Sequence, residues 1–595
     1  MKKTLSLLLC LCMVLSAVPA LAYTAGTYTG EGTGNNADVK IVVEVTFSED
    51  AIIDIKVVSH EETPGISDPA FDRIPAAVME SQSLAVDAVS GATNTSNGLL
   101  AAIEDAAVKA DADIAAMKAS ARTEAAEVEK TETEQTTDVL VIGAGVAGMS
   151  AAIAARESGL NVTVIDKMAA VGGTTNLAGG ILVCVDSELF KDNRLESDSL
   201  EAILAYWKAH MAKSGVDSGY PDWDRLESVL AETGANVDWL VANGIEFGAE
   251  PYAGSSTYPM ALANGGGSGL ASMLCKSMTD KGVTLITECK GTELIVDETG
   301  AVVGAKAETA DSIITFHAKS VILATGGISQ NEELVAKYSP KLHRAGLIPT
   351  SAVSHTGDGF LMALEVGAGT FDSFATPLFG TTVDPAFAAI NPAAGGLTIY
   401  GQLGVNADGM RFGNEAASAG WDVMDYTASD MIQNGIAPFW YIYDSSDPAV
   451  AEILESGVAD DVVAKGETIE ELALDMHVYT SVLKYTFEAY NEAAAAGEDA
   501  EFNKPAMFLN ALTQAPFYAV KVYPTTFGSA GGVTTTEQGR VTRQDGTVIP
   551  GLYAAGEMSN RYFYNENYIL AASLGLYSTM GHRAGAAAAE DAMAK

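Results

Sequence analysis

Residues 138–166 read DVLVIGAGVAGMSAAIAARESGLNVTVID, and the order of segments within them decides the fold. The apolar run at 139–142 predicts a buried strand, the alanine-rich stretch at 147–158 predicts a helix, and the run at 162–165 predicts a second strand. A strand, a helix and a strand in this order form a βαβ unit, whose two strands lie parallel in one sheet. The sequence therefore predicts an α/β fold with a Rossmann-like domain here.

The turn between the first strand and the helix has the spacing GxGxxG of a dinucleotide-binding loop. Gly143 makes the tight turn, Gly145 lets backbone amides approach a pyrophosphate, and Gly148 lets the helix lie close to the strand. The helix N-terminus favours the phosphate charge. Asp166 ends the second strand, 18 residues after Gly148, where it can accept hydrogen bonds from a ribose. The pattern predicts a bound dinucleotide, and the loop alone leaves FAD and NAD open.

The composition narrows the class of protein. A chain of 595 residues exceeds what a single core usually holds, so we expect several domains. The formal net charge of −43 makes a nucleic-acid partner unfavourable. Residues 1–22 combine a charged start, an apolar run and a small-residue end, which predicts a secretory signal peptide and an extracytoplasmic location. No CxxCH motif for a c-type haem occurs, and the three cysteines outside this segment are too scattered for a disulfide framework or a metal site: Cys184, Cys275 and Cys289.

Five further motifs follow the dinucleotide loop in a fixed order. They are the glycine-rich loop at 172–180, Ala324-Thr-Gly-Gly327, Thr356-Gly-Asp358-Gly, the stretch Val405–Glu415, and Gly551-Leu-Tyr-Ala-Ala-Gly556-Glu557. From about Thr137 to the C-terminus the chain thereby resembles the fumarate reductase/succinate dehydrogenase flavoprotein superfamily, in a form without haem that is similar to flavocytochrome c and urocanate reductases. The resemblance implies that the dinucleotide is non-covalent FAD.

The same resemblance implies a set of FAD-binding residues, in which Glu557 binds the sugar chain and the segment after it closes over the flavin ring. The expected set comprises Gly143, Gly145, Ala147, Gly148, Asp166, Lys167, Gly173, Thr174, Thr175, Gly179, Gly180, Asp358, Gly528, Glu557, Ala572, Ser573 and Leu574.

Residues 60–98 read HEETPGISDPAFDRIPAAVMESQSLAVDAVSGATNTSNG and resemble the FMN-binding domain of sodium-pumping quinone reductases. The string DAVSGAT, ending at Thr93, matches that family's flavinylation signal, where a flavin transferase joins the FMN phosphate to the threonine hydroxyl. The resemblance implies covalent FMN on Thr93, with Thr95 as the second candidate and His60 as a candidate contact. The alternative is an ordinary turn that caps the following helix.

The acceptor site departs from the family pattern. Fumarate reductases of the superfamily hold their dicarboxylate with histidines and arginines and deliver the proton from another arginine. Aligned by eye, these positions and the proton relay fall on Thr376, Gly395, Thr398, Ala419, Phe527 and Asn567, so none is retained. Without cationic donors a dianion should bind poorly, because each charge-assisted hydrogen bond contributes about 1.5–3 kcal/mol. We therefore expect that fumarate is not the substrate.

Aromatic and hydrogen-bonding residues stand near this site instead. Related ketosteroid dehydrogenases place a tyrosine close to the position of Tyr568, where it polarises a ketone. We expect Tyr568 to polarise or protonate the substrate, aided by Tyr564, Arg561 or Tyr400. For each residue alone, packing is the alternative, but the run RYFYNENY at 561–568 favours a pocket wall. Its expected companions at the site are Trp421, Tyr562 and Phe563.

The predicted organisation is a signal peptide at 1–22, a small α+β FMN-binding domain at 23–118, a linker at 119–137, a Rossmann-like FAD-binding domain at 138–370 with 526–595, and an inserted α+β capping domain at 371–525. The favoured function is an extracytoplasmic reductase. Electrons from a membrane or extracellular donor would pass through FMN and FAD to the activated C=C bond of a small enoate or enone. The alternatives are a dehydrogenase or oxidase running in reverse, and a non-catalytic electron shuttle.

Overall fold

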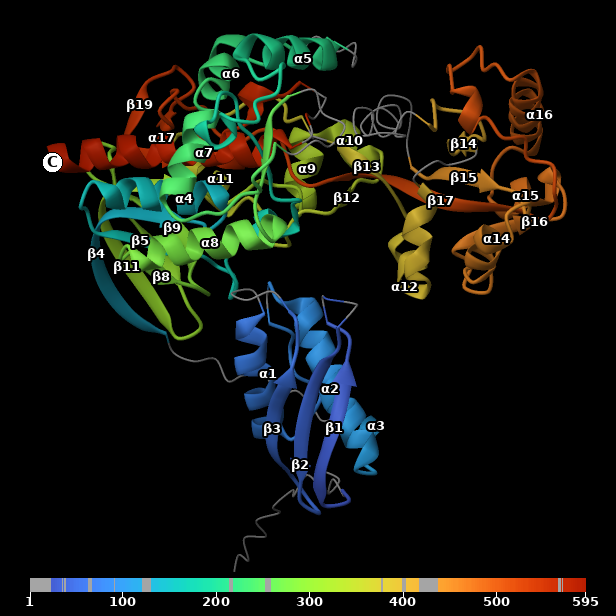
Figure 1. The fold of residues 1–595 in the computed structure, drawn as a ribbon, viewed down its shortest axis with the longest axis horizontal. Helices are drawn as coiled ribbons and strands as arrows, with labels where there is room; N and C mark the ends of the chain where they lie inside the picture. The colour runs from blue at the N-terminus through green and yellow to red at the C-terminus, as the bar shows by residue number, and fades with distance from the viewer. Residues whose placement is uncertain are drawn as a thin grey trace, which may run out of the picture. The chain divides into compact units, whose positions relative to one another are not determined.

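A computed structural model describes residues 23–34, 36, 39–62, 67–89, 91–119, 130–212, 218–251, 258–375, 378–398, 403–416, 437–565, 569 and 571–595. The chain divides into two compact units, Met1–Val128 and Glu129–Lys595 (Figure 1). The predicted signal peptide lies outside the described residues. Among the described helices, none is long and apolar enough to cross a membrane.

The first unit is a small α+β domain. Strands β1 (Gly26–Gly32), β2 (Ile41–Phe47) and β3 (Ile52–Ser59) form an antiparallel sheet in that order. Every second residue of β2 is buried, as its alternating sequence IVVEVTF requires. Helices α1 (Asp68–Ser81), α2 (Thr93–Lys109) and α3 (Ile114–Ala119) complete the unit. Helix α2 packs very closely on β1, because a Cβ on Gly32 would lie 1.9 Å from the carbonyl oxygen of Gly98.

The second unit is built on a mainly parallel sheet whose central order is β18-β19-β11-β4-β5-β8. Its strands are β4 (Thr131–Ile142), β5 (Val162–Ile165), β8 (Thr284–Ile286), β9 (Lys290–Val296), β10 (Val302–Glu308), β11 (Ser312–Leu323), β18 (Arg540–Thr542) and β19 (Val548–Ala554). Strands β4 and β5 pair in parallel, and helix α4 (Val146–Glu157) connects them, which confirms the predicted Rossmann-like fold. Strand β4 begins at Thr131, inside the segment 119–137 that we predicted as a linker. The polar residues 131–137 form strand because they pair in register with β11, from Ser312↔Thr131 onward.

Two helices that pack on this sheet also pack closely against each other. Helix α4 (Val146–Glu157) carries the dinucleotide loop at its start, and α17 (Ala572–Ala594) lies across it. A Cβ on Gly581 would lie 2.1 Å from the carbonyl oxygen of Ala147, so only glycine permits this approach. The remaining elements around the sheet are η1 (Gly173–Leu177), β6 (Ile181–Val183), η2 (Glu188–Phe190), α5 (Leu200–Ala212), α6 (Trp223–Leu230), α7 (Thr233–Ala242), β7 (Met260–Leu262), α8 (Gly266–Asp280), α9 (Glu332–Tyr338), α10 (Pro340–Arg344), α11 (Asp358–Glu365), η5 (Gly556–Met558) and η6 (Arg561–Phe563).

A second sheet lies largely within the segment predicted as the capping domain. Its strands are β12 (Ile348–Pro349), β13 (Leu378–Val383), β14 (Leu403–Val405), β15 (Phe439–Tyr443), β16 (Val463–Gly466) and β17 (Phe517–Thr526), with α12 (Pro385–Ile390), η3 (Pro392–Thr398), α14 (Pro448–Glu455), α15 (Ile469–Asp475), α16 (Thr480–Ala496) and η4 (Ala506–Phe508) around it. Alternate residues of β15 enter two apolar cores, Tyr441 in one and Trp440 in the other. The insertion is therefore α+β with helices covering both faces of its sheet.

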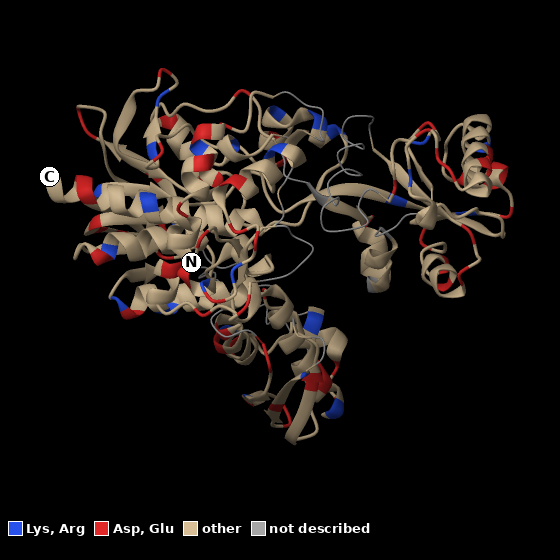
Figure 2. Cartoon of the chain, turned by 45° about the horizontal axis from the view of Figure 1, so that its top comes forward, with Lys and Arg blue, Asp and Glu red and all other residues tan. Residues whose placement is uncertain are grey.

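Asp and Glu residues occur in the elements of both units (Figure 2). The chain has 77 Asp and Glu against 34 Lys and Arg, and its acidic residues are spread along the chain rather than confined to one tail.

Candidate flavin and substrate site

A cavity of about 350 Å³ opens at the carboxyl ends of the parallel strands. Ile142 at the end of β4 and Ile165 at the end of β5 line it, and Ala324 follows β11 in the same wall. The segment Ala555–Glu557, which follows β19, completes this edge. Ligands of doubly wound sheets bind at this edge, so the cavity lies where the predicted dinucleotide belongs.

The three glycines of the GxGxxG loop differ in what surrounds them. Gly143 has φ +106°, and a Cβ there would lie 2.3 Å from the carbonyl oxygen of Ala324. At Gly148 a Cβ would lie 1.9 Å from the carbonyl oxygen of Gly143. At Gly145 the nearest neighbour of a Cβ would be 3.7 Å away, and Gly145 lines the cavity. The first amide of the helix behind it, that of Val146, donates to Thr175 Oγ1 at 3.1 Å. Two glycines thus allow the chain to pack, while the third leaves room for a ligand, as a bound pyrophosphate requires.

Asp166 fixes the loop from the second strand. Its carboxylate accepts hydrogen bonds from the amides of Ala144 at 2.7 Å and Met168 at 2.8 Å. Burial raises the pKa of Asp166, and the two amides act in the opposite direction. Each carboxylate oxygen keeps a further lone pair for a ribose hydroxyl.

Two lysines of the cavity wall converge on one carboxylate. Lys167 Nζ lies 2.5 Å from Asp358 Oδ2 and 2.6 Å from Thr356 Oγ1. Lys290 Nζ lies 3.0 Å from the other oxygen of Asp358. Burial alone would raise the pKa of Asp358, but the hydrogen bonds from both lysines and Thr356 outweigh it and hold this pKa below its usual value. The lysines are therefore already paired, which joins β5, β9 and α11 around the site.

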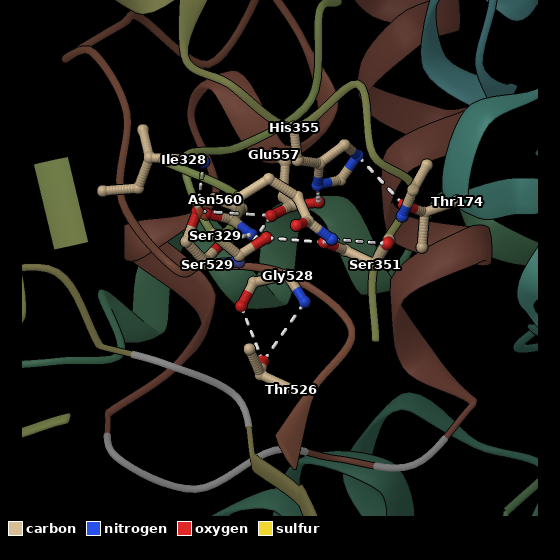
Figure 3. Close-up of polar contacts among 12 residues, drawn as sticks. Thr174, Ile328, Ser329, Ser351, His355, Thr526, Gly528, Ser529, Glu557 and Asn560 are labelled. Atoms are coloured by element: carbon tan, nitrogen blue, oxygen red, sulfur yellow. Dashed lines mark hydrogen bonds and ion pairs between the residues drawn. The ribbon is translucent and has the colours of Figure 1, made fainter. Parts of the chain in front are cut away.

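A buried histidine and a buried glutamate face each other in the same wall (Figure 3). His355 Nδ1 lies 3.4 Å from Glu557 Oε2, and its Nε2 lies 3.0 Å from Thr174 Oγ1. Ser529 donates its backbone N–H to Glu557 Oε1 at 2.5 Å. Burial raises the pKa of Glu557 to about 8, and burial together with the charge of Lys167 lowers the pKa of His355 to about 4. At neutral pH both groups are therefore mainly uncharged.

The lining contains the expected FAD-binding residues except Gly148, Gly180 and Ala572. Gly148 and Gly180 support the wall from behind, since a Cβ on Gly180 would lie 2.2 Å from the carbonyl carbon of Gly266. Ala572 is buried as the first residue of α17. His355, Cys289 and Tyr577 also line the cavity, although the sequence motifs do not predict them as site residues. A usable signal existed only for His355, which directly precedes the Thr356-Gly-Asp358 motif.

The described part of the RYFYNENY run packs behind the cavity rather than lining it. Tyr564 is fully buried, but its hydroxyl lies 3.0 Å from Oγ of Ser573, a lining residue. Arg561 donates to the backbone carbonyls of Ser373, Tyr564 and Asn565, and its guanidinium stacks over Tyr220. These carbonyls hold Arg561 in the core. Tyr400, Trp421 and Tyr568 lie outside the described residues, as do the aligned positions Thr376, Ala419 and Asn567, whereas Phe527 lines the cavity.

The predicted FMN attachment site lies in the first unit. Thr93 is the first residue of α2 and is exposed. Thr95 is 4% exposed, and its hydroxyl donates to Glu62 Oε2. His60 stacks on Phe71 with ring centroids 4.0 Å apart. A modifying enzyme can therefore reach the hydroxyl of Thr93 but not that of Thr95.

Two family descriptions match the chain: FAD binding domain over residues 138–573 and FMN-binding domain over residues 36–108. A urocanate reductase of Eggerthella lenta is 31% identical over 91% of this chain and 89% of its own length. An NADH:acrylate oxidoreductase of Vibrio harveyi is 29% identical over 92% of this chain, which spans 59% of that relative. The solved open conformation of a flavocytochrome c3 fumarate reductase is 26% identical, with a TM-score of 0.58 over 77% of this chain and 79% of that chain.

Proposed function

Because the chain belongs to the fumarate reductase/succinate dehydrogenase flavoprotein superfamily and joins an FAD-binding to an FMN-binding domain, we propose that it is a reductase of activated C=C bonds. Electrons enter at FMN, pass to FAD and reduce a small organic acceptor. The overall reaction adds two electrons and two protons across the double bond. The related proteins named for acrylate and urocanate support an acceptor whose C=C bond is conjugated to an electron-withdrawing group.

The observation that carries this proposal is the composition of the cavity wall. The cavity that holds the expected FAD residues also presents the apolar side chains of Ile181, Phe527 and Leu574, beside the hydroxyl groups of Ser573 and Tyr577. Bound FAD supplies hydride-transfer chemistry at this wall. The apolar side chains exclude water from the reacting carbon atoms, and the hydroxyl groups can bind one carbonyl or carboxylate of the acceptor.

The character of the wall favours an acceptor with at most one carboxylate. Among the described lining residues no arginine occurs, and the two lysines are paired with Asp358. Phe527 occupies the position that aligns with a substrate histidine of fumarate reductases. A dicarboxylate such as fumarate would therefore lack charge-assisted hydrogen bonds for its second carboxylate.

We propose Thr93 as the residue that carries FMN through a phosphoester, attached by a flavin transferase. Its exposure at the start of α2 supports this role. A covalent link keeps FMN on the protein outside the cell, and residues 1–22 support export as a signal peptide. A membrane or extracellular donor would then deliver the electrons.

A viologen assay under anaerobic conditions tests the proposal. Holoprotein made together with a flavin transferase is given chemically reduced viologen and a panel of enoates, enones and fumarate. We expect viologen oxidation with one or more monocarboxylic or neutral acceptors, at rates in the usual enzymatic range of about 1–10³ s⁻¹. Rapid turnover of fumarate alone, or no turnover with any acceptor, would contradict the proposed specificity or the proposed activity respectively.

A further inference from the structure

The charges that line the FAD cavity are not balanced. Among the described lining residues, the side chains with a full charge in solution are two lysines and three carboxylates: Lys167, Lys290, Asp166, Asp358 and Glu557. Both lysines contact Asp358. FAD adds two negative phosphate charges to this enclosed space. An ionised Glu557 would therefore face further negative charge in a medium of low dielectric constant, which is costly.

Backbone packs closely around Glu557, and no lysine or arginine contacts its carboxylate among the described contacts. A Cβ on Gly327 would lie 2.2 Å from Glu557 Oε1, and a Cβ on Gly528 would lie 2.4 Å from the same atom. Ser529 binds this oxygen through its backbone N–H. The other oxygen, Oε2, faces only the imidazole of His355 among the described contacts. The simplest way to neutralise Glu557 is therefore a proton.

His355 is placed to respond to that proton. Its side chain is 6% exposed, and its Nδ1 has no hydrogen-bond partner among the described residues, although it lies 3.4 Å from Glu557 Oε2. On the other side, Nε2 faces Thr174 Oγ1, which also accepts the backbone N–H of Ala352 at 3.0 Å (Figure 3). Thr174 can donate to or accept from Nε2, so the ring can adopt either tautomer. His355 can thus accept from the acid form of Glu557 or donate to its carboxylate.

We propose that FAD binds in this cavity only with a proton on Glu557, and that His355 is the positioning residue that sets how readily Glu557 releases it. Where the apoprotein has lost this proton, it is taken up from solvent on binding, so that ionised apoprotein, FAD and one proton give the neutral-glutamate holoprotein. The other charged groups of the cavity lining are Asp166 and Lys167, which follow β5, Lys290 from β9 and Asp358 from α11. The raised pKa of Glu557, about 8, agrees with a proton retained at neutral pH.

The proton on Glu557 makes the affinity for FAD depend on pH in one direction. Below the pKa of Glu557 the apoprotein already holds the proton, so FAD binding is independent of pH. Above it the proton must be taken up, so the affinity for FAD falls by up to tenfold per pH unit. The contact with His355 stabilises the carboxylate more than the acid, because a hydrogen bond to a charged acceptor is the stronger one. Removing the imidazole should therefore move the onset of this fall to higher pH by about one unit.

Calorimetric titration of the full-length apoprotein with FAD, in two buffers of different ionisation enthalpy, counts the protons. We expect close to none at about pH 6 and a clear fraction of one per FAD at about pH 9. Flavin fluorescence then gives the affinity across the same range. The inference rests on FAD occupying this cavity and not on the acceptor. Binding of FAD without proton uptake at either pH would overturn it and leave the proposed function intact, whereas absence of FAD binding would overturn both.

Variants separate the two roles. Glu557→Gln should bind FAD with an affinity that no longer depends on pH. His355→Leu should move the pH at which the affinity begins to fall upward. His355→Gln, which keeps an N–H donor, should move this pH by a smaller amount. The matched control is His343→Leu, since His343 lies 3.2 Å from Glu332 in an exposed pair of the same fold. An unchanged onset in His355→Leu, or an equal shift in the control, would remove His355 from the proposal. If Glu557→Gln does not fold, the proton count of the wild-type protein decides.

Discussion

The FAD and FMN sites of this chain place opposite demands on the polypeptide. The FAD cavity is enclosed, and its wall comes from segments as far apart in the sequence as Gly143 and Tyr577. The proposed FMN site centres on one exposed residue at the start of a helix, Thr93. A non-covalent ligand needs enclosure and many weak contacts, whereas a covalent one needs only an acceptor atom that a modifying enzyme can reach. The comparison predicts that substitutions remove the two flavins in different ways: FMN by loss of its attachment, and FAD by weaker binding.

The largest expected effect is on FMN. Thr93→Ala should abolish the FMN adduct completely when the protein is made with a flavin transferase, because the substitution removes the hydroxyl that would form the phosphoester. Thr95→Ala is the matched control and should keep the adduct, since Thr95 is buried against Glu62. Mass spectrometry of the tryptic peptide measures both. Acid precipitation should release FAD but not FMN; an adduct that persists in Thr93→Ala would move the attachment site.

The predictions of the two sites rest on the same kind of signal in the sequence. The sequence predicts the phosphate loop because the conformation and close packing of its backbone require glycine at fixed positions. A side chain at Gly143 or Gly148 would overlap a carbonyl oxygen, so the glycine spacing itself reports the geometry. The flavinylation string is equally local. Both predictions rest on residues close together in the chain.

What the sequence did not predict depends on contacts between distant segments. The polar stretch at 131–137 resembles a linker, but pairing with β11 makes it a strand. Arg561 and Tyr564 belong to a run that suggests a pocket wall, but backbone carbonyls and the packing around Trp207 keep them in the core. His355 directly precedes the Thr356-Gly-Asp358 motif, but its contact with Glu557, about 200 residues away in the chain, appears only in the fold.

The next effect concerns the acceptor rather than the flavins. Tyr568 remains our prediction for the group that polarises or protonates the substrate. General acids contribute roughly 10²–10⁴-fold, so Tyr568→Phe should lower turnover by that order. Its flavin content and FAD photoreduction should match the wild type, which separates a chemical role from a packing role. Unchanged turnover with a verified acceptor would direct attention to Tyr400 and Tyr564.

A smaller effect is expected on the affinity for FAD when the close packing around its cavity is disturbed. Gly148→Ala places a Cβ against the carbonyl oxygen of Gly143, so α4 must move away from β4. Such overpacking typically costs about 1–3 kcal/mol, and we expect a lower melting temperature together with roughly tenfold weaker FAD binding. Gly159→Ala is the control, because nothing lies within 4 Å of a Cβ there although its φ is +80°. It should lower stability through backbone strain alone and leave the affinity for FAD unchanged. Equal losses of FAD in both variants would contradict a specific role of Gly148.

The last effect concerns the proposed acceptor end of the cavity, where Phe527 falls, in our alignment, on the position of a substrate histidine of fumarate reductases. Phe527→His restores one cationic donor when the imidazole is protonated, below about pH 6.5. A single charge-assisted hydrogen bond contributes about 1.5–3 kcal/mol, so the KM for a carboxylate acceptor should fall about tenfold or more at low pH. The improvement should disappear as the pH rises and the imidazole loses its proton. Phe527→Leu, which changes shape without adding charge, should show no such pH dependence, and FAD content should be equal in both variants. A KM for carboxylates that stays constant in Phe527→His across the pH range would mean that Phe527 does not face the acceptor, and the specificity of the cavity would then depend on Ser573 and Tyr577.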